Sequence, residues 1–410
     1  MNILYINHYA GSVSMGMEFR PYYLAKEWQK KGHKVRIIAA DYSHLRKQNP
    51  VVSKNFEIQE IDGIEYQWIK TNTYEGNGVS RAITMAQFCT ALMTGSKKIA
   101  NDFKPDVVIS SSTYPLDAYP ARKIANIAKA KHIHEVHDMW PATLYEIGGM
   151  SKTNPFVVAM QIGENYAYKN CDELVSLLSN AKPYMVTHGL KSRKFHCLKN
   201  GIVESEWETK DPLPEEHRKL LEGLRNDGKL VVGYFGGHAL SNALDTIIDV
   251  AKEMQGEKDI AFVLTGDGDE KARIQERVRS EKVDNVSFLP PIAKTAVPSL
   301  LELYDIALVT AANSPLYRFG ICMNKIFDAM MAGIPIVLSV NADNTPVEEA
   351  DCGIVVKTGE KKEIVDAVRN ILGKDEKERK RIGDKGKALV MEKYTYESIA
   401  NDFLTIMNDK

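Results

Sequence analysis

One order of segments occurs twice in this chain, and it constrains the fold more than any other feature. An apolar run, a loop that contains glycine and a helical pattern follow one another at residues 3–31 and again at residues 229–255. Apolar runs that alternate with helical patterns are typical of parallel sheets covered by helices. A chain of 410 residues is also long for a single hydrophobic core. We therefore predict an α/β fold with two Rossmann-like domains that face each other across a ligand-binding cleft.

The composition is that of a folded protein, which we expect in the cytoplasm. Hydrophobic residues make up 44% of the chain and charged residues 26%. The five cysteines are scattered and form no Cys-x-x-Cys pair, so we expect reduced thiols and no disulfide or zinc framework. The chain starts directly on a strand pattern, and no uncharged apolar run approaches the ~20 residues that span a bilayer. We expect neither a secretory signal nor a membrane-spanning helix.

The charge is distributed unevenly along the chain. Residues 1–198 carry 24 Lys and Arg against 17 Asp and Glu, whereas the remainder carries 29 against 37. The basic half could face anionic lipid or nucleic acid, or it could simply have solvated helix faces. Residues 81–103 form an amphipathic pattern that fits a helix on a membrane surface or a helix in the core. Aromatic and basic residues do not interleave, so we expect no nucleic-acid partner and retain peripheral contact with an anionic membrane.

The richest candidate site lies in a loop and helix of the second half. We expect the helix from about residue 322 to 332, with Gly333 ending it in the left-handed conformation. Asn324, Lys325 and Asp328 lie three or four residues apart and so share a face. Unpaired N–H groups at the helix start, together with Lys325, suit a phosphate, and Asp328 is placed to bind a diol such as ribose. The stretch predicts a nucleotide site; the alternative is a solvated ion pair on a helix surface.

Two other loops carry polar residues at the ends of strand patterns. His137 and Asp138 directly follow the strand pattern at 132–136, and such positions face the ligand crevice of parallel sheets. A histidine there could bind a sugar hydroxyl or could be structural. The Gly236-Gly237 loop and the helix start at Asn242 form a second potential phosphate cradle.

Cofactor and metal motifs are missing from these loops. No Gly-x-Gly-x-x-Gly follows the first strand pattern, so a dinucleotide cofactor is not indicated. Asp267 and Asp269 match the sequence pattern of a metal-binding Asp-x-Asp motif, but we interpret them as part of a turn between a strand and a helix. We expect no metal site.

Residues 320–335 resemble the donor-nucleotide motif of glycosyltransferase family 4, in which two acidic residues separated by seven others precede Ala-Met-Ala-x-Gly-x-Pro. They look closest to the branch of N-acetyl-L-fucosamine transferases of bacterial O-antigen assembly, which has the run Phe-Gly-Ile-Ser-Pro-Asn-Lys-Leu-Phe-Asp. Asp328 matches the second acid, which implies a ribose contact. Gly320 stands at the first acid, so the contact which that acid makes to the donor sugar is absent.

The first loop carries the same resemblance. Residues 17–25, Met-Glu-Phe-Arg-Pro-Tyr-Tyr-Leu-Ala, are similar to the fucosamine-transferase branch. The resemblance implies that Gly16 approaches the donor phosphates, for which a turn glycine is the alternative. It also assigns Glu18 and Arg20 to the acceptor.

The remaining site residues follow from the resemblance in the same way. His137 and Asp138 begin a segment similar to the family's His-Asp-Leu-Trp-Pro, which implies that His137 touches the donor sugar and that Asp138 orients the loop or the acceptor. His238 would help to hold the pyrophosphate when protonated. The implied donor-binding residues are Gly16, Gly237, His238, Asn242, Pro291, Ile292, Asn324, Lys325 and Asp328. The implied catalytic residues are His137, Asp138 and Lys325.

The resemblance covers nearly the whole chain and implies a B-type glycosyltransferase. Residues 1–200 would bind the acceptor, residues 201–390 the nucleotide sugar, and residues 391–410 would form a helix that crosses back to the first domain. The implied enzyme is retaining and metal-independent, needs no cofactor, and moves a sugar such as an N-acetylated deoxyhexosamine from a UDP-linked donor to a lipid-linked or saccharide acceptor. A sugar-nucleotide 2-epimerase and a non-catalytic nucleotide-sugar-binding assembly protein remain alternatives.

Overall fold

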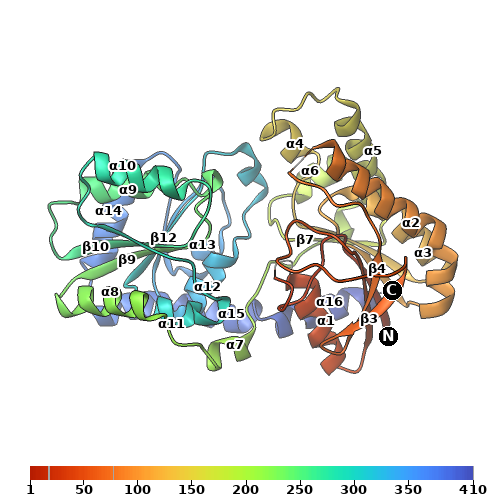
Figure 1. Ribbon diagram of the computed structural model, residues 1–410, viewed down its shortest axis with the longest axis horizontal. Coiled ribbons are helices and arrows are strands. Elements are labelled where there is room, and N and C mark those ends of the chain that lie inside the picture. Colours follow the sequence, from red (N-terminus) through yellow and green to blue (C-terminus); the bar gives the residue numbers. More distant parts are fainter. Residues whose placement is uncertain (17–18, 77, 410) are drawn as a thin grey trace. The chain divides into compact units, whose positions relative to one another are not determined.

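Two separate sheets organise the chain in the computed structural model, which describes residues 1–16, 19–76 and 78–409. Unit 1 contains Met1–Lys199 and the chain from Tyr396 onward, and unit 2 contains Asn200–Thr395 (Figure 1). The fold is the predicted one: two α/β units, each built on a parallel sheet.

The sheet of unit 1 has eight strands, of which only β3 runs antiparallel to its neighbour β4. The strand order reverses beside β1, between β2 and β5, so the ligand crevice of this sheet is expected after β1 and β5. In spatial order the strands are β3 (Glu57–Ile61), β4 (Ile64–Ile69), β2 (Lys34–Ala40), β1 (Asn2–Ile6), β5 (Val107–Ser110), β6 (Lys131–Val136), β7 (Glu173–Ser176) and β8 (Phe195–Cys197).

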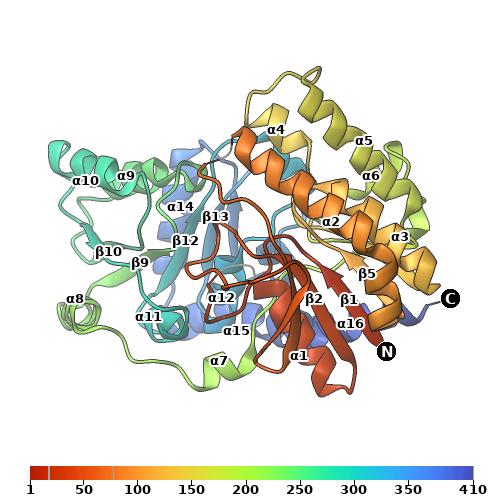
Figure 2. The same ribbon diagram turned by 45° about the vertical axis from the view of Figure 1, so that its right-hand side comes forward.

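Helices cover both faces of this sheet (Figure 2). They are α1 (Phe19–Lys30), α2 (Val79–Phe103), α3 (Ala118–Ala128), α4 (Ala142–Glu146), α5 (Pro155–Asn170), α6 (Lys182–Thr187) and α16 (Tyr396–Asn408). The apolar stripe of α2 is a core stripe, because Phe88 and Leu92 are fully buried in one cluster with β1, β2 and α3, and only Ile83 of that stripe stays largely exposed. In α16, the backbone oxygen of Ala400 accepts a hydrogen bond from the Trp28 indole at 3.2 Å, which ties the helix to α1.

Unit 2 has a six-stranded, all-parallel sheet. In spatial order the strands are β11 (Val286–Leu289), β10 (Ile260–Thr265), β9 (Leu230–Phe235), β12 (Ile306–Thr310), β13 (Ile336–Ser339) and β14 (Gly353–Val356). The order reverses between β9 and β12, so the loops that follow these two strands flank the crevice where such sheets bind ligands.

Each face of this sheet has its own core of buried residues. One core is formed with α8 (Glu215–Asn226), α11 (Val297–Leu301), α12 (Asn324–Ala332), α13 (Pro346–Ala350) and α15 (Glu376–Lys393). The other is formed with α9 (Leu244–Glu253), α10 (Lys271–Ser280) and α14 (Lys361–Leu372). A short helix, α7 (Glu204–Glu208), precedes α8.

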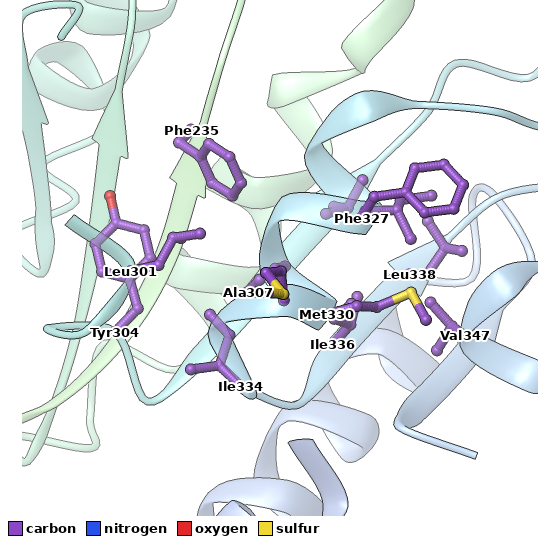
Figure 3. Packing of buried hydrophobic residues seen from close by; sticks show 14 of the residues in the cluster. Phe235, Leu301, Tyr304, Ala307, Phe327, Met330, Ile334, Ile336, Leu338 and Val347 are labelled. Carbon is purple, nitrogen blue, oxygen red and sulfur yellow. The ribbon is translucent and has the colours of Figure 1, made fainter. Parts of the chain in front are cut away.

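Helix α12 is anchored along its buried side. Phe327 and Met330 point into the core shared with β13 and α13 (Figure 3). At its C-terminal end Gly333 takes a positive φ of 68°, as predicted, and the backbone of α15 comes so close that a Cβ on Gly383 would lie 2.0 Å from the Gly333 oxygen. Because these contacts hold the buried side and the C-terminal end of α12, they also fix the position of its N-terminal turn relative to β12.

The C-terminal segment divides differently from the predicted ranges. Helix α15 continues to Lys393, so residues 391–395 belong to unit 2, and only the chain from Tyr396 onward belongs to unit 1. Among the described residues, no helix is long and apolar enough to cross a membrane.

Candidate functional site

Lys325 lies in the first turn of α12, beside the point where the strand order of unit 2 reverses. Its ammonium group donates to the Tyr234 hydroxyl at 2.9 Å and to the Asn242 side-chain oxygen at 2.8 Å. The residue that precedes the helix, Met323, has no side-chain oxygen to cap it, and although its backbone oxygen accepts from the Ile326 N–H at 3.0 Å, the N–H groups of Asn324 and Lys325 have no partner in the described part of the chain and stay available to an anion. The positive charge and the helix start therefore meet at one edge of the sheet.

The loop after β9 holds this lysine in place. Tyr234 and Asn242 both donate to the backbone oxygen of Gly237, at 2.7 and 2.9 Å. A Cβ on Gly236 would lie 3.4 Å from the Lys325 ammonium, so the loop backbone passes directly beside the charge. Gly237 and Asn242 are thus brought to Lys325 as predicted, and their contact with a donor stays a prediction.

Burial lowers the pKa of Lys325 to about 8. If the protonated amine binds a diphosphate, affinity should fall as the pH rises through this value. We expect UDP to bind roughly eightfold more weakly at pH 9 than at pH 7.5, measured by calorimetry. The Lys325→Arg variant should show no such fall because guanidinium stays protonated; an equally steep fall in that variant would contradict the assignment.

Asp328 lies one turn further along α12 and is half-buried. Burial raises its pKa to about 7, opposed by Lys294 and reinforced by Glu206. No hydrogen-bond partner for this carboxyl occurs among the described residues, which is the arrangement expected of a group that awaits a ligand hydroxyl. Asn324, by contrast, already accepts a hydrogen bond from the Asn200 side chain at 2.9 Å.

His238 differs from its prediction. The ring is fully buried, and burial, followed by the nearby Lys271 charge, lowers its pKa to about 4. Without a ligand it is therefore neutral at physiological pH, unlike the protonated form that was predicted, and its contact with a donor stays a prediction. Its backbone N–H donates to Asp267 at 2.7 Å and fastens the loop after β9 to the loop after β10.

The loops after β10 and β11 complete this edge of the sheet. Asp267 and Asp269 lie between β10 and α10, in the predicted turn. Pro291 and Ile292 directly follow β11, and the backbone groups of Ile292 make no hydrogen bond to the described part of the chain. They remain open to a nucleotide base, which is what the resemblance implies for this position.

The backbone explains the missing acid at residue 320. Gly320 has a φ of 102° and a ψ of 177°, a region that is essentially restricted to glycine. It ends the short 3₁₀ segment Pro315–Phe319, which leads from β12 toward α12. An Asp or Glu at this position would strain the loop. The backbone conformation therefore requires glycine where the family motif has its first acid.

The corresponding edge of unit 1 holds a buried polar network around Glu135, the fifth residue of β6. Its carboxylate accepts from the Arg20 Nε at 2.9 Å, from the Ser111 hydroxyl at 2.6 Å, and from the Tyr5 hydroxyl. His137 Nε2 lies 2.9 Å from the same carboxylate. Three segments distant in sequence, together with the neighbouring His137, therefore converge on one acidic group.

Arg20 is not placed to bind an acceptor, which corrects the prediction. Its side chain is 4% exposed, and besides the Glu135 pair it donates to the backbone oxygens of Leu198 and Lys199 at 3.0 and 2.8 Å. These bonds join α1, β6 and the end of the first unit. Arg20 is a structural residue of unit 1.

The other predicted residues of unit 1 lie around this network. The side chain of His137 is 15% exposed and Asp138 is exposed. Gly16 has a φ of 73° and ends a turn packed on Lys47, which satisfies the turn interpretation and leaves its phosphate contact a prediction. Glu18 lies outside the described residues.

Sequence reasoning missed Tyr234, Tyr5 and Ser111. Each lies in a buried strand or directly after one, where the sequence pattern predicts core packing and not a site. Their hydroxyl groups could have indicated the site, because a hydroxyl in a buried strand needs a hydrogen-bond partner, and the partner here is a charged site residue.

Two family models match the chain. The model described as Glycosyltransferase Family 4 matches residues 15–206, and the model described as Glycosyl transferases group 1 matches residues 229–374. The chain is also 22% identical over 298 residues to the putative colanic acid biosynthesis glycosyl transferase WcaI of Escherichia coli K12, with 69% of this chain and 70% of that protein covered.

Solved structures share the fold over essentially the whole chain. Sucrose-phosphate synthase from Thermosynechococcus elongatus is similar with a TM-score of 0.72 at 15% identity, covering 99% of this chain and 98% of that one. HepE from Anabaena, solved with UDP and glucose, has a TM-score of 0.66 at 15% identity with the same coverage. WaaG, a glycosyltransferase involved in lipopolysaccharide biosynthesis, has a TM-score of 0.67 at 13% identity and full coverage of both chains.

Proposed function

This chain belongs to glycosyltransferase family 4, and on that premise we propose that it transfers a sugar from a UDP-linked donor to a lipid-linked or saccharide acceptor in cell-surface polysaccharide biosynthesis. The observation that carries the proposal is the edge of unit 2, where Lys325 lies in the first turn of α12 and the Asp328 carboxyl has no hydrogen-bond partner among the described residues. A diphosphate and a ribose diol, the two parts common to nucleotide sugars, match these two groups in charge and hydrogen bonding.

The relatives support the choice of donor and pathway. HepE was solved with UDP and glucose, and WcaI is described as a colanic acid biosynthesis enzyme. We extend both to this chain as parts of the proposal, together with a deoxyhexosamine as the transferred sugar and action at the inner face of the cytoplasmic membrane.

The proposed mechanism places the chemistry on the leaving group. Negative charge develops on the nucleotide diphosphate as the sugar bond breaks, and Lys325 with the α12 dipole would stabilise it. The leaving phosphate would deprotonate the acceptor on the same face of the sugar, which retains the anomeric configuration. Trapping of a covalent glycosyl-enzyme would exclude this route, and loss of turnover in EDTA would exclude metal independence.

The direct test is a donor panel. Purified protein would be incubated with UDP-, GDP- and dTDP-sugars, with and without a lipid-pyrophosphate N-acetylhexosamine, and released nucleotide diphosphate and glycolipid would be measured. We expect release from one UDP-sugar that depends on the acceptor. Conversion of the donor without acceptor would instead identify an epimerase, and binding without release would identify a non-catalytic protein.

A further inference from the structure

We propose that Glu135 is a positioning residue that holds the His137 ring on its carboxylate and keeps that ring protonated at neutral pH. The inference rests on the proposed function and on the donor-sugar contact that the family resemblance implies for His137, and it assigns the charge state and orientation of that ring. Glu135 itself is fully buried and would not touch the substrate.

The contact between the two side chains fixes which ring nitrogen carries hydrogen. Glu135 Oε2 lies 2.9 Å from His137 Nε2, and the Ser111 hydroxyl lies 3.0 Å from the same nitrogen. An ionised carboxylate only accepts hydrogen bonds, so Nε2 must be the donor. Any hydrogen bond from the ring to a substrate then comes from Nδ1.

Arg20 keeps Glu135 ionised. Burial alone would raise the pKa of Glu135, but the Arg20 guanidinium at 2.9 Å and then His137 lower it more, and the net pKa lies well below the ordinary value. The hydroxyls of Tyr5 and Ser111 donate to the same carboxylate. A carboxylate with this many donors has no need of a proton.

Three further titratable groups interact with His137 among the residues that the structure describes, and each either favours its protonated form or is neutral. The carboxyls of Asp117, at the start of α3, and of Asp138, in the loop after β6, both interact electrostatically with the His137 ring. Burial raises the pKa of Asp117 to about 7, so it is only partly ionised at neutral pH. His134 faces the ring as well, but burial lowers its pKa to about 4 and leaves it neutral. The positive charge of Arg20, which binds the same carboxylate, is paired with Glu135.

A protonated His137 would affect how the substrate is bound and not a proton-transfer step. A ring that stays protonated is a charged donor, and hydrogen bonds from charged donors are about twice as strong as neutral ones. Positioning by Glu135 also removes the freedom of the ring to turn away. His137 could then orient a sugar hydroxyl without giving up its proton.

The test is the titration of the His137 ring in the full chain. NMR of protein labelled with ¹⁵N-histidine, with the signal assigned by its loss in His137→Gln, gives the ring pKa. We expect a value above the ordinary one of about 6.5 in the wild type and a fall of about one pH unit or more in Glu135→Gln. Glu164→Gln is the matched control, because Glu164 is equally buried and hydroxyl-bonded, to Tyr168 and Tyr184, but does not contact His137.

Activity gives a second readout. The limb of the kcat profile that falls as the pH rises should shift to lower pH in Glu135→Gln by the same amount as the NMR titration, while UDP affinity stays unchanged. An identical His137 titration in wild type and Glu135→Gln would overturn the proposal. If Glu135→Gln fails to fold, Glu135→Asp keeps the charge that Arg20 pairs with and withdraws the carboxylate from Nε2, and an unshifted titration in that variant would overturn it equally. The NMR result needs no donor, so it stays readable even if the protein transfers no sugar.

Discussion

Replacement of Lys325 by alanine is expected to reduce kcat by about 100- to 1,000-fold, the usual cost of removing one preorganised charge stabiliser from an active site. The expectation follows from its position in the first turn of α12, where Tyr234 and Asn242 hold the ammonium beside the Gly236 backbone. Because this geometry exists before any ligand binds, the positive charge of Lys325 is already in position when negative charge develops on the leaving diphosphate. The effect should therefore appear in kcat and not only in KM.

The measurement is acceptor-dependent release of nucleotide diphosphate at saturating donor. Lys362→Ala is the control, since Lys362 lies exposed in α14 and forms no ion pair or hydrogen bond among the described residues. It should keep wild-type turnover. A Lys325→Ala enzyme with unchanged kcat would remove the central role given to this residue.

The helix that carries Lys325 could be predicted from sequence because its signals are local. The apolar pattern, the break at Gly320 and the left-handed glycine at Gly333 place α12 within two residues of its observed start. The neighbours of the helix are not local. Tyr234 and Asn242 come from some 80 to 90 residues earlier, and only the reversal of strand order between β9 and β12 brings them to Lys325.

The errors arose where burial decides the role of a residue. Arg20 and His238 carry polar groups in a helix and a loop near a ligand crevice. From such a position in the sequence pattern, a ligand-binding role is predicted. In the structure Arg20 is sealed against Glu135 and two backbone oxygens, and His238 is neutral because its ring is enclosed. Neither burial can be inferred from residue spacing.

The β3–β4 hairpin shows a local signal that was available and not used. Asp62 and Gly63 join the two strands and have φ values of 52° and 80°, as a two-residue hairpin turn requires. An Asp-Gly pair between alternating runs is a strong hairpin signal. Because it was not used, both strands of the hairpin, β3 and β4, were missed, but the site was not affected.

Replacement of Arg20 by alanine is expected to lower the free energy of unfolding of unit 1 by about 3–5 kcal/mol, the cost of leaving one partner of a buried ion pair alone. The guanidinium is 4% exposed and Glu135 is fully buried, so water cannot replace the lost partner. The oxygens of Leu198 and Lys199 lose their donors at the same time. Lys30→Ala is the matched control on the same helix, because its pair with Glu27 is solvent-exposed at the lysine and should contribute at most about 1 kcal/mol.

Urea unfolding followed by tryptophan fluorescence separates unit 1 from unit 2. Trp28, Trp68 and Trp140 all lie in unit 1, so a Trp207→Phe background reports on that unit alone. The double variant Arg20→Met/Glu135→Gln should lose less stability than Arg20→Ala, since it removes both charges and leaves neither buried without its partner. If Arg20→Ala instead lowered the free energy of unfolding no more than Lys30→Ala, the Arg20–Glu135 pair would not stabilise unit 1. The acceptor-binding role predicted for Arg20 from the sequence would then be the better interpretation.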